Sequence, residues 1–193
     1  MGISTAPSVS ASVTSTLQSG SAVAGKFGID QTTPGSTNLV EAANIPANIA
    51  VTPTVSTSPA YSSGDAVGGL QVLTGAIRLN AGTSLLRSIT ITDKGNQKVA
   101  FDIIFFNAAP TAPTDNAAYA TLGTDIAKVV GRVRILTTDY DTVNSIGLAS
   151  QLNIGLVMAS GATQNLWAIV VTTGTPTYAS TTDLTFTYNF EQN

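Results

Sequence analysis

Histidine and cysteine are both absent from the 193 residues of the chain. Without cysteine there can be no disulfide and no thiolate chemistry, and the redox compartment stays undetermined. Without histidine there can be no Ser-His-Asp or Cys-His pair, and the commonest protein ligand of zinc and iron is missing. Catalysis by carboxylates or lysine stays formally open, but the two absences predict a protein that is not an enzyme and that uses no cofactor and no metal.

Charge is also scarce, at 10% of residues against roughly 25% in an average soluble protein. The net charge is −3 and there is no basic run, so we expect no binding to nucleic acid or to an anionic membrane. No stretch reaches the ~20 apolar residues of a membrane span. The first five residues lack the basic and apolar regions of a signal peptide, so assembly in a cytoplasm is expected.

Small neutral residues take the place of charge, chiefly Thr, Ser, Ala, Gly and Asn, while 43% of the chain is hydrophobic and can build a core. Desolvating Ser, Thr and Asn costs less than desolvating Lys or Glu. Such a surface suits a protein that packs against copies of itself or against neighbours. An ordinary β-sandwich with a Thr-rich face explains the composition equally well.

Residues 1–48 differ from the rest, because Ser, Thr, Val and Ala dominate their first half and glycines recur after it. One interpretation is a flexible tail. The other, which we favour, is an extended arm that becomes ordered only against neighbouring subunits, since it is too apolar for a solvated linker. We expect this arm to make its contacts through Val9, Val13, Leu17 and Phe27.

Residues 49–193 show strand patterns separated by turn signals, and they predict a single domain. Residues 85–92 and 97–106 each alternate between apolar and polar positions, and residues 93–96 between them have the composition of a tight turn. These features predict a β-hairpin over residues 85–106, with its second strand in the middle of a sheet.

Six further segments predict strands, because each is apolar or alternating and is bounded by turn residues. Residues 114–122 could form a short helix, and Gly68 and Gly69 predict a turn. With at most one short helix, we expect an all-β, eight-stranded β-sandwich of jelly-roll-like topology, preceded by the extended N-terminal arm. The six further strands are expected at residues 50–55, 70–73, 129–136, 146–158, 166–172 and 183–190.

Oxygen ligands for calcium occur together at Asp139, Asp141 and Asn144, but the spacing of a complete EF-hand loop is missing, and a polar turn explains them better. Gly64 and the pair that follows it resemble a nucleotide-binding loop only loosely, because no Gly-Lys-Ser/Thr motif is present. Turn glycines with positive φ are the better explanation.

One pair of carboxylates could carry out acid–base catalysis. Asp93 and Asp102 could act as an acid–base pair, although ion pairs with Lys94 or Lys98 on a solvated face explain them better.

Arg132 and Arg134 lie two residues apart, so they share one face of a predicted strand. They could meet an acidic partner surface, or they could be ordinary solvent-facing arginines. We take them, with the arm residues, as the interface candidates of this chain. No catalytic, cofactor-binding or metal-binding residue is predicted.

Several turn-and-strand motifs occur between residue 50 and the carboxyl end. They are SPAYSSGDAVGG at residues 58–69, ITITDK at 89–94, FFNAAPT at 105–111, TDNAA at 114–118, TPTYA at 175–179 and DLT at 183–185. These motifs contain no catalytic residues. They resemble those of a group of tailed-bacteriophage virion proteins, and the similarity extends from about residue 50 to the carboxyl end.

The resemblance implies a structural protein of the virion, assembled in the host cytoplasm, and more closely a capsid decoration or cement protein. Its partners would be the major capsid protein and copies of itself, in a homo-oligomer. A major capsid subunit is a further structural option. The alternative from another class is a tail or fibre component with a glycan-binding adhesin domain, for which Tyr61, Tyr140 and Tyr178 could form an aromatic platform. A β-sandwich hydrolase would need a convergent carboxylate pair.

Overall fold

A computed structural model describes residues 45–120 and 122–193 of the chain. Nine strands and three short helical turns occur in this part. The strands are β1 (Ile45–Val51), β2 (Ala66–Leu73), β3 (Thr83–Asp93), β4 (Phe101–Phe106), β5 (Val129–Ile135), β6 (Tyr140–Val143), β7 (Ile146–Ala159), β8 (Leu166–Thr172) and β9 (Leu184–Gln192). The helical turns are α1 (Leu122–Asp125), η1 (Ile126–Lys128) and η2 (Thr137–Asp139).

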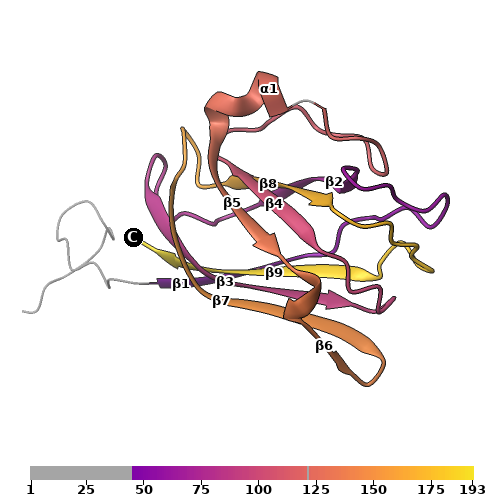
Figure 1. Ribbon diagram of the computed structural model, residues 1–193. Coiled ribbons are helices and arrows are strands. Elements are labelled where there is room, and N and C mark those ends of the chain that lie inside the picture. The colour runs from indigo at the N-terminus through magenta and orange to yellow at the C-terminus, as the bar shows by residue number, and fades with distance from the viewer. Residues whose placement is uncertain (1–44, 121) are drawn as a thin grey trace, which may run out of the picture. The chain divides into compact units, whose positions relative to one another are not determined.

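The strands form two antiparallel sheets, of order β1-β9-β3-β7-β6 and β2-β8-β4-β5, stacked as two layers (Figure 1). When the short β6 is set aside, the pairs are nested: β4 with β5, β3 with β7, β2 with β8, and β1 with β9. The chain therefore follows the path of one long hairpin wrapped around a core, which is a jelly roll. The predicted all-β sandwich is confirmed, and β6 is the strand that the prediction of eight did not include.

Buried and exposed side chains alternate along the strands, and the buried ones form a core between the two sheets. In β9, Leu184, Phe186, Tyr188 and Phe190 are buried, while the residues between them are partly exposed. The Phe186 ring meets Phe101 of β4 edge to face, with the ring centroids 5.8 Å apart. Truncating a buried phenylalanine such as Phe186 to alanine typically costs about 3–5 kcal/mol, so this layer of rings holds the two sheets together.

The predicted hairpin over residues 85–106 is wrong, although both of its strands form. β3 lies in the five-stranded sheet and β4 in the four-stranded sheet, so their apolar faces meet across the core instead of lying side by side. Residues 94–100 cross between the sheets with Asn96 and Lys98 in left-handed conformations (φ 52° and 51°). The central position predicted for the second strand is confirmed, because β4 pairs with both β5 and β8.

Gly68 and Gly69 lie inside β2, not in the predicted turn. The pairing of β2 with β8 shifts between Ala66 and Leu70, which marks a β-bulge. Both glycines have the positive φ expected of them (72° and 68°). The Gly68 N–H donates to Asp115 Oδ1 at 2.6 Å, so the bulge is held by a side chain from a distant segment.

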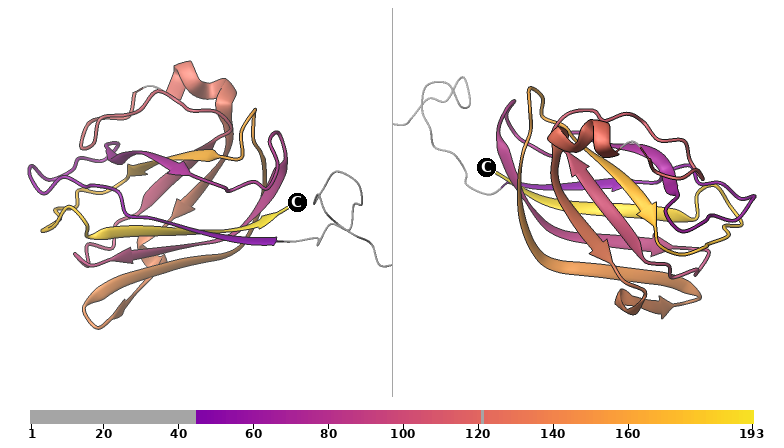
Figure 2. Two further views of the ribbon diagram at one scale, coloured as in Figure 1. Left: turned by 180° about the vertical axis from the view of Figure 1, so that it is seen from behind. Right: turned by 45° about the horizontal axis from the view of Figure 1, so that its top comes forward.

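Residues 107–120 and 122–128, here called the cover segment, lie over the outer face of the four-stranded sheet (Figure 2). Their first part is the predicted loop, but the short helix expected over residues 114–122 does not form there. Asn116 donates its N–H to the Ala66 carbonyl and the Ala117 carbonyl accepts the Ala66 N–H, both at 2.9 Å. Because this backbone pairs with the edge of β2, the helical turn begins only at α1.

The predicted boundary between residues 48 and 49 falls inside β1, whose seven residues all pair with β9. The arm and its contacts Val9, Val13, Leu17 and Phe27 lie outside the described residues, so they stay predictions. In the described part of the chain, no helix has the length and apolar character needed to span a membrane.

Candidate interaction surfaces

The outer face of the four-stranded sheet is apolar, and the cover segment packs on it. Ile104, Phe106 and Ile169 are buried there in a second, smaller cluster, with Tyr119 and Leu122 of the cover segment against them. Val72, at the edge of this face, is 45% exposed. This side of the body is therefore largely occupied by the chain itself.

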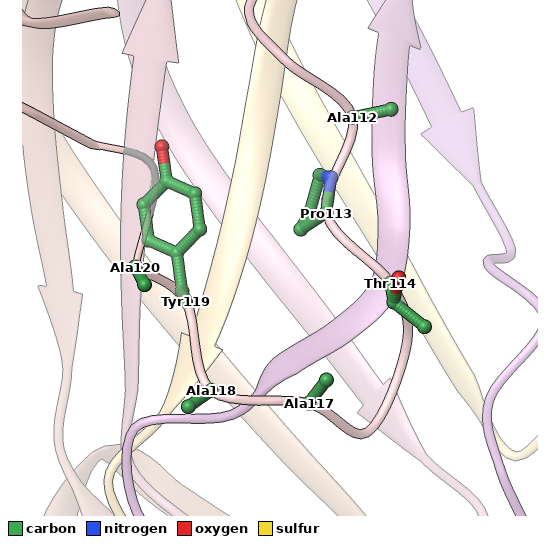
Figure 3. Close-up of a pocket in the computed structure, with 7 residues that line it drawn as sticks. All are labelled: Ala112, Pro113, Thr114, Ala117, Ala118, Tyr119 and Ala120. Carbon is green, nitrogen blue, oxygen red and sulfur yellow. The ribbon is translucent and has the colours of Figure 1, made fainter. Parts of the chain in front are cut away.

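The cover segment contains a shallow hollow of about 180 Å³ (Figure 3). The Tyr119 ring stands on one side of it, and Pro113 and Thr114 on the other. Alanine side chains supply the rest of the lining, and no charged group lines it. Sites for small molecules usually enclose ~300–1,000 Å³ and converge several polar groups, so this hollow does not have the features of such a site.

The outer face of the five-stranded sheet is not covered by any of residues 45–120 and 122–193, as both sides of the molecule show (Figures 1 and 2). Residues that pair across adjacent strands form rows on this face, and the rows show its composition. One row runs Ala50, Thr187, Thr90 and Ser150, and the next runs Asn48, Asn189, Ser88 and Leu152.

Polar groups on this face bond to one another. Asn189 Nδ2 donates to Ser88 Oγ at 2.8 Å, and the hydroxyls of Thr52 and Thr185 are 2.9 Å apart. Near one end of the sheet, Glu191 is paired with Arg87 at 3.2 Å. The exposed Asp141 of β6, opposite Leu148, adds one further charge, so the face carries few charges and its polar groups are already partly satisfied.

Three exposed aliphatic side chains form a stripe along β7 on the same face. Leu148 is 36%, Leu152 66% and Val157 61% exposed. We call these three residues the aliphatic stripe. Large contiguous apolar patches on soluble proteins mark contacts with another molecule, whereas single exposed apolar residues are common. The sequence interpretation missed the stripe because Gly147 and Gly155 interrupt the segment, although Leu148 and Leu152 share the period-2 phase that places them on one face.

Arg132 and Arg134 lie on the outer face of β5, where both bind Asp102 of β4. Arg132 Nη2 and Arg134 Nε donate to Asp102 Oδ1 at 2.8 and 2.9 Å, and Arg134 Nη2 donates to Oδ2 at 3.0 Å. The hydrogen bonds from Arg134, with those from Arg132, lower the pKa of Asp102, and the carboxylate raises the pKa of Arg134. Both arginines are about half exposed, so they stay candidates for a partner contact, with part of their hydrogen-bonding capacity used.

The expected ion pairs of Asp93 and Asp102 with Lys94 or Lys98 are wrong. Asp102 binds the two arginines, and Asp93 is fully buried, with its Oδ2 accepting the backbone N–H of Lys98 at 2.8 Å. Burial raises the pKa of Asp93, and the nearby carboxylate of Asp183 raises it further. Asp93 ends β3 and Asp183 immediately precedes β9. Each carboxylate accepts hydrogen bonds from backbone N–H groups of the adjoining segment that crosses between the two sheets.

The aromatic platform proposed for glycan binding is also wrong. Tyr61, Tyr140 and Tyr178 are all buried, and Tyr61 and Tyr178 pack edge to face with ring centroids 5.9 Å apart. Burial raises the pKa of all three phenols. They are core residues of the sandwich. Sequence could not separate them from exposed tyrosines, because Tyr61 and Tyr178 lie outside the strands and Tyr140 begins the short β6, which has no alternating pattern.

The polar segment around Asp139 is a structural turn. Asp139 Oδ2 accepts the Leu136 N–H at 2.7 Å and the Gln151 amide at 2.6 Å, so the carboxylate closes η2 and ties it to β7. Within the described residues, no group of three or more metal-binding side chains comes together.

No family model and no curated protein matches this chain. A solved structure of desmodium yellow mottle tymovirus is 13% identical, with a TM-score of 0.25, over 91% of this chain and 95% of that one. A mutant VP2 protein of infectious bursal disease virus is 11% identical, with a TM-score of 0.18, over 87% of this chain and 40% of that one. A structure of the Gx strain of the same virus is 10% identical, with a TM-score of 0.17, over 87% of this chain and 42% of that one. TM-scores this low carry no argument about function.

Proposed function

We propose that this chain is a structural protein of a virus particle, and more closely a bacteriophage capsid decoration or cement protein. It would bind the major capsid protein and copies of itself, and stabilise the shell through contacts between subunits. Its place would be the virion, after assembly in the host cytoplasm. It would have no catalytic role.

The jelly-roll topology is compatible with this proposal without singling it out, since viral capsid domains, lectins and cupins all use the fold. The resemblance of the turn-and-strand motifs to those of phage virion proteins favours a virion protein among these classes. A virion protein needs surfaces that many copies can present repeatedly, because each modest contact is multiplied by the symmetry of the shell.

The outer face of the five-stranded sheet, which no segment of residues 45–120 and 122–193 covers, is the observation that carries the proposal. It combines hydroxyl and amide groups with the aliphatic stripe, and among the described residues its charges are the ion pair of Arg87 with Glu191 and the carboxylate of Asp141. Desolvating such a face costs little compared with a charged one, so it suits burial against a neighbouring subunit.

Electron microscopy of particles that contain and lack the chain tests the proposal directly. We expect additional density at symmetric positions on the shell, and a lower temperature of shell rupture in particles without it. Density confined to the tail or portal would contradict the decoration role. It would favour the tail or fibre alternative, for which the structure no longer offers the tyrosine platform.

Limited proteolysis tests the arm. Residues around Ser12 should be cleaved more slowly in particles than in the free protein if residues 1–44 are covered on assembly. Equal cleavage rates in the two states would exclude a threaded arm.

A further inference from the structure

The aliphatic stripe leaves three apolar side chains in solvent on a face that no described segment covers. Leu148 pairs with Thr92 and Leu152 with Ser88, so both point away from the core. Val157 pairs with Leu85, which is half-buried on the same face. The stripe therefore runs from one end of β7 to the other, with hydroxyls of Ser88, Thr92 and Ser150 beside it.

We propose that the aliphatic stripe binds residues 8–17 of a neighbouring copy. This segment reads SVSASVTSTL, so Val9, Val13 and Leu17 fall four residues apart, with Ser, Thr and Ala11 between them. In an extended chain these three side chains point to the same face. The choice of a neighbouring copy rests on the proposed function, whereas the match between segment and stripe does not.

The spacing of the two partners agrees. Val9 to Leu17 spans eight residues of extended chain, or about 26 Å at ~3.3 Å per residue. Leu148 and Val157 lie opposite Thr92 and Leu85 of β3, which are seven residues apart, or about 23 Å. The bulge in β7 opposite Arg87 takes up the two extra residues of that strand, so three apolar side chains can meet three.

The length of the preceding chain allows this contact. Residues 18–44 connect the segment to Ile45 at the start of β1, and a coil of that length spans roughly 30 Å on average and up to ~90 Å when extended. A folded body of about 150 residues has a radius of gyration of roughly 15 Å, so the stripe of an adjacent copy lies within reach.

The lack of charged side chains in both partners also favours residues 8–17 as the segment that binds the stripe. Residues 8–17 contain no charged side chain, and neither does the stripe. The hydroxyls beside the stripe offer hydrogen-bond partners to the Ser and Thr residues and to the backbone of an added chain. The exposed carboxylate of Asp141 lies opposite Leu148 at one end of the stripe, so a polyanion such as nucleic acid would be repelled there.

Disulfide trapping tests the contact, because the chain has no cysteine of its own. Full-length Val13→Cys and Leu152→Cys proteins are mixed, both concentrated in solution and on particles, and mildly oxidised. We expect a mixed disulfide dimer, with mass spectrometry joining the peptides that contain positions 13 and 152. Val72→Cys replaces Leu152→Cys as the matched control, since Val72 is also exposed but lies on the other sheet. It should give at least about tenfold less mixed dimer.

Each other pattern of products overturns the proposal and names another occupant. A disulfide within one chain, found in the Val13→Cys/Leu152→Cys double variant but not in the mixture, assigns the stripe to its own arm. Leu152→Cys homodimers alone assign it to the same face of a second copy. Equal yields with Leu152→Cys and Val72→Cys show that the segment has no preferred site.

A second variant separates this contact from the proposed function. In the Leu152→Asp variant, proteases should cleave the arm on particles about tenfold faster, because burying one leucine contributes roughly that factor to binding. Val72→Asp should leave the cleavage rate unchanged. If Leu152→Asp protein still decorates particles with its arm protected, the contact is wrong and the proposed function stands. If the 13–152 disulfide forms in solution but the protein is absent from particles, the contact stands and the proposed function is wrong.

Discussion

Asp93 is a carboxylate in the core whose Oδ1 meets no hydrogen-bond donor among the described residues. Burial raises its pKa above the ordinary value of 3.8, so the folded state holds the proton more tightly than the unfolded chain does. The stability it contributes is therefore complete below pH 3.8, and it is lost as the pH rises through the folded-state pKa.

Asp93→Asn should remove this dependence, because asparagine cannot ionise and still has an oxygen to accept the Lys98 N–H. We expect the free energy of unfolding of the variant to fall less than that of the parent between about pH 4 and pH 7. Urea denaturation at a series of pH values measures this. The exposed Asp141→Asn serves as the control, and parallel curves for parent and Asp93→Asn would contradict the argument.

Asp115 joins the cover segment to residues 61–68 through one oxygen. Its Oδ1 accepts the Tyr61 hydroxyl at 2.7 Å and the Gly68 N–H at 2.6 Å. Asp115→Ala would leave a buried hydroxyl without its acceptor, so we expect a loss of about 1–3 kcal/mol in the free energy of unfolding. Chemical denaturation checks this against Asp141→Ala, and equal stability of the two variants would show that water replaces the carboxylate.

At the scale of single elements, the bulge in β2 depends on Gly68. An alanine there would have φ near +72° and its Cβ would collide with Pro53. Gly64→Ala is a matched control, because Gly64 also has a positive φ (97°) but has open space around its Cα. We expect Gly64→Ala to cost about 1–2 kcal/mol and Gly68→Ala about 2–5 kcal/mol. Equal melting temperatures would mean that the strand moves away from Pro53 without cost.

Strand positions were the most predictable part of the fold, because alternation reports which face of a strand is buried. The segments at residues 166–172 and 183–190 became β8 and β9 almost unchanged. The hairpin over residues 85–106 failed for a physical reason, since an apolar face fits equally well beside a partner strand or opposite one across a core. Short-range sequence does not distinguish the two, and the turn composition at residues 93–96 favoured the wrong choice.

The surfaces were harder to predict than the strands. Arg132 and Arg134 were correctly expected on one face, but their shared partner Asp102 comes from a strand about thirty residues earlier. The aliphatic stripe was missed because an exposed leucine and a buried one look identical in sequence. Only the register of β7 against β3 shows which side of the sheet each residue faces.

For the whole molecule, the small number of charges predicts how its assembly responds to salt. If the outer face of the five-stranded sheet makes the contacts, the amount of protein bound to particles should change by less than about twofold between 0.05 and 0.5 M NaCl. The reason is that salt screens charges and does not screen apolar burial.

If Arg132 and Arg134 instead bind an acidic partner in place of Asp102, the amount of bound protein should fall steeply over the same range. Quantifying bound protein on sedimented particles across the salt series separates the two surfaces, and repeating it with Arg132→Gln/Arg134→Gln identifies the arginines if they are the cause.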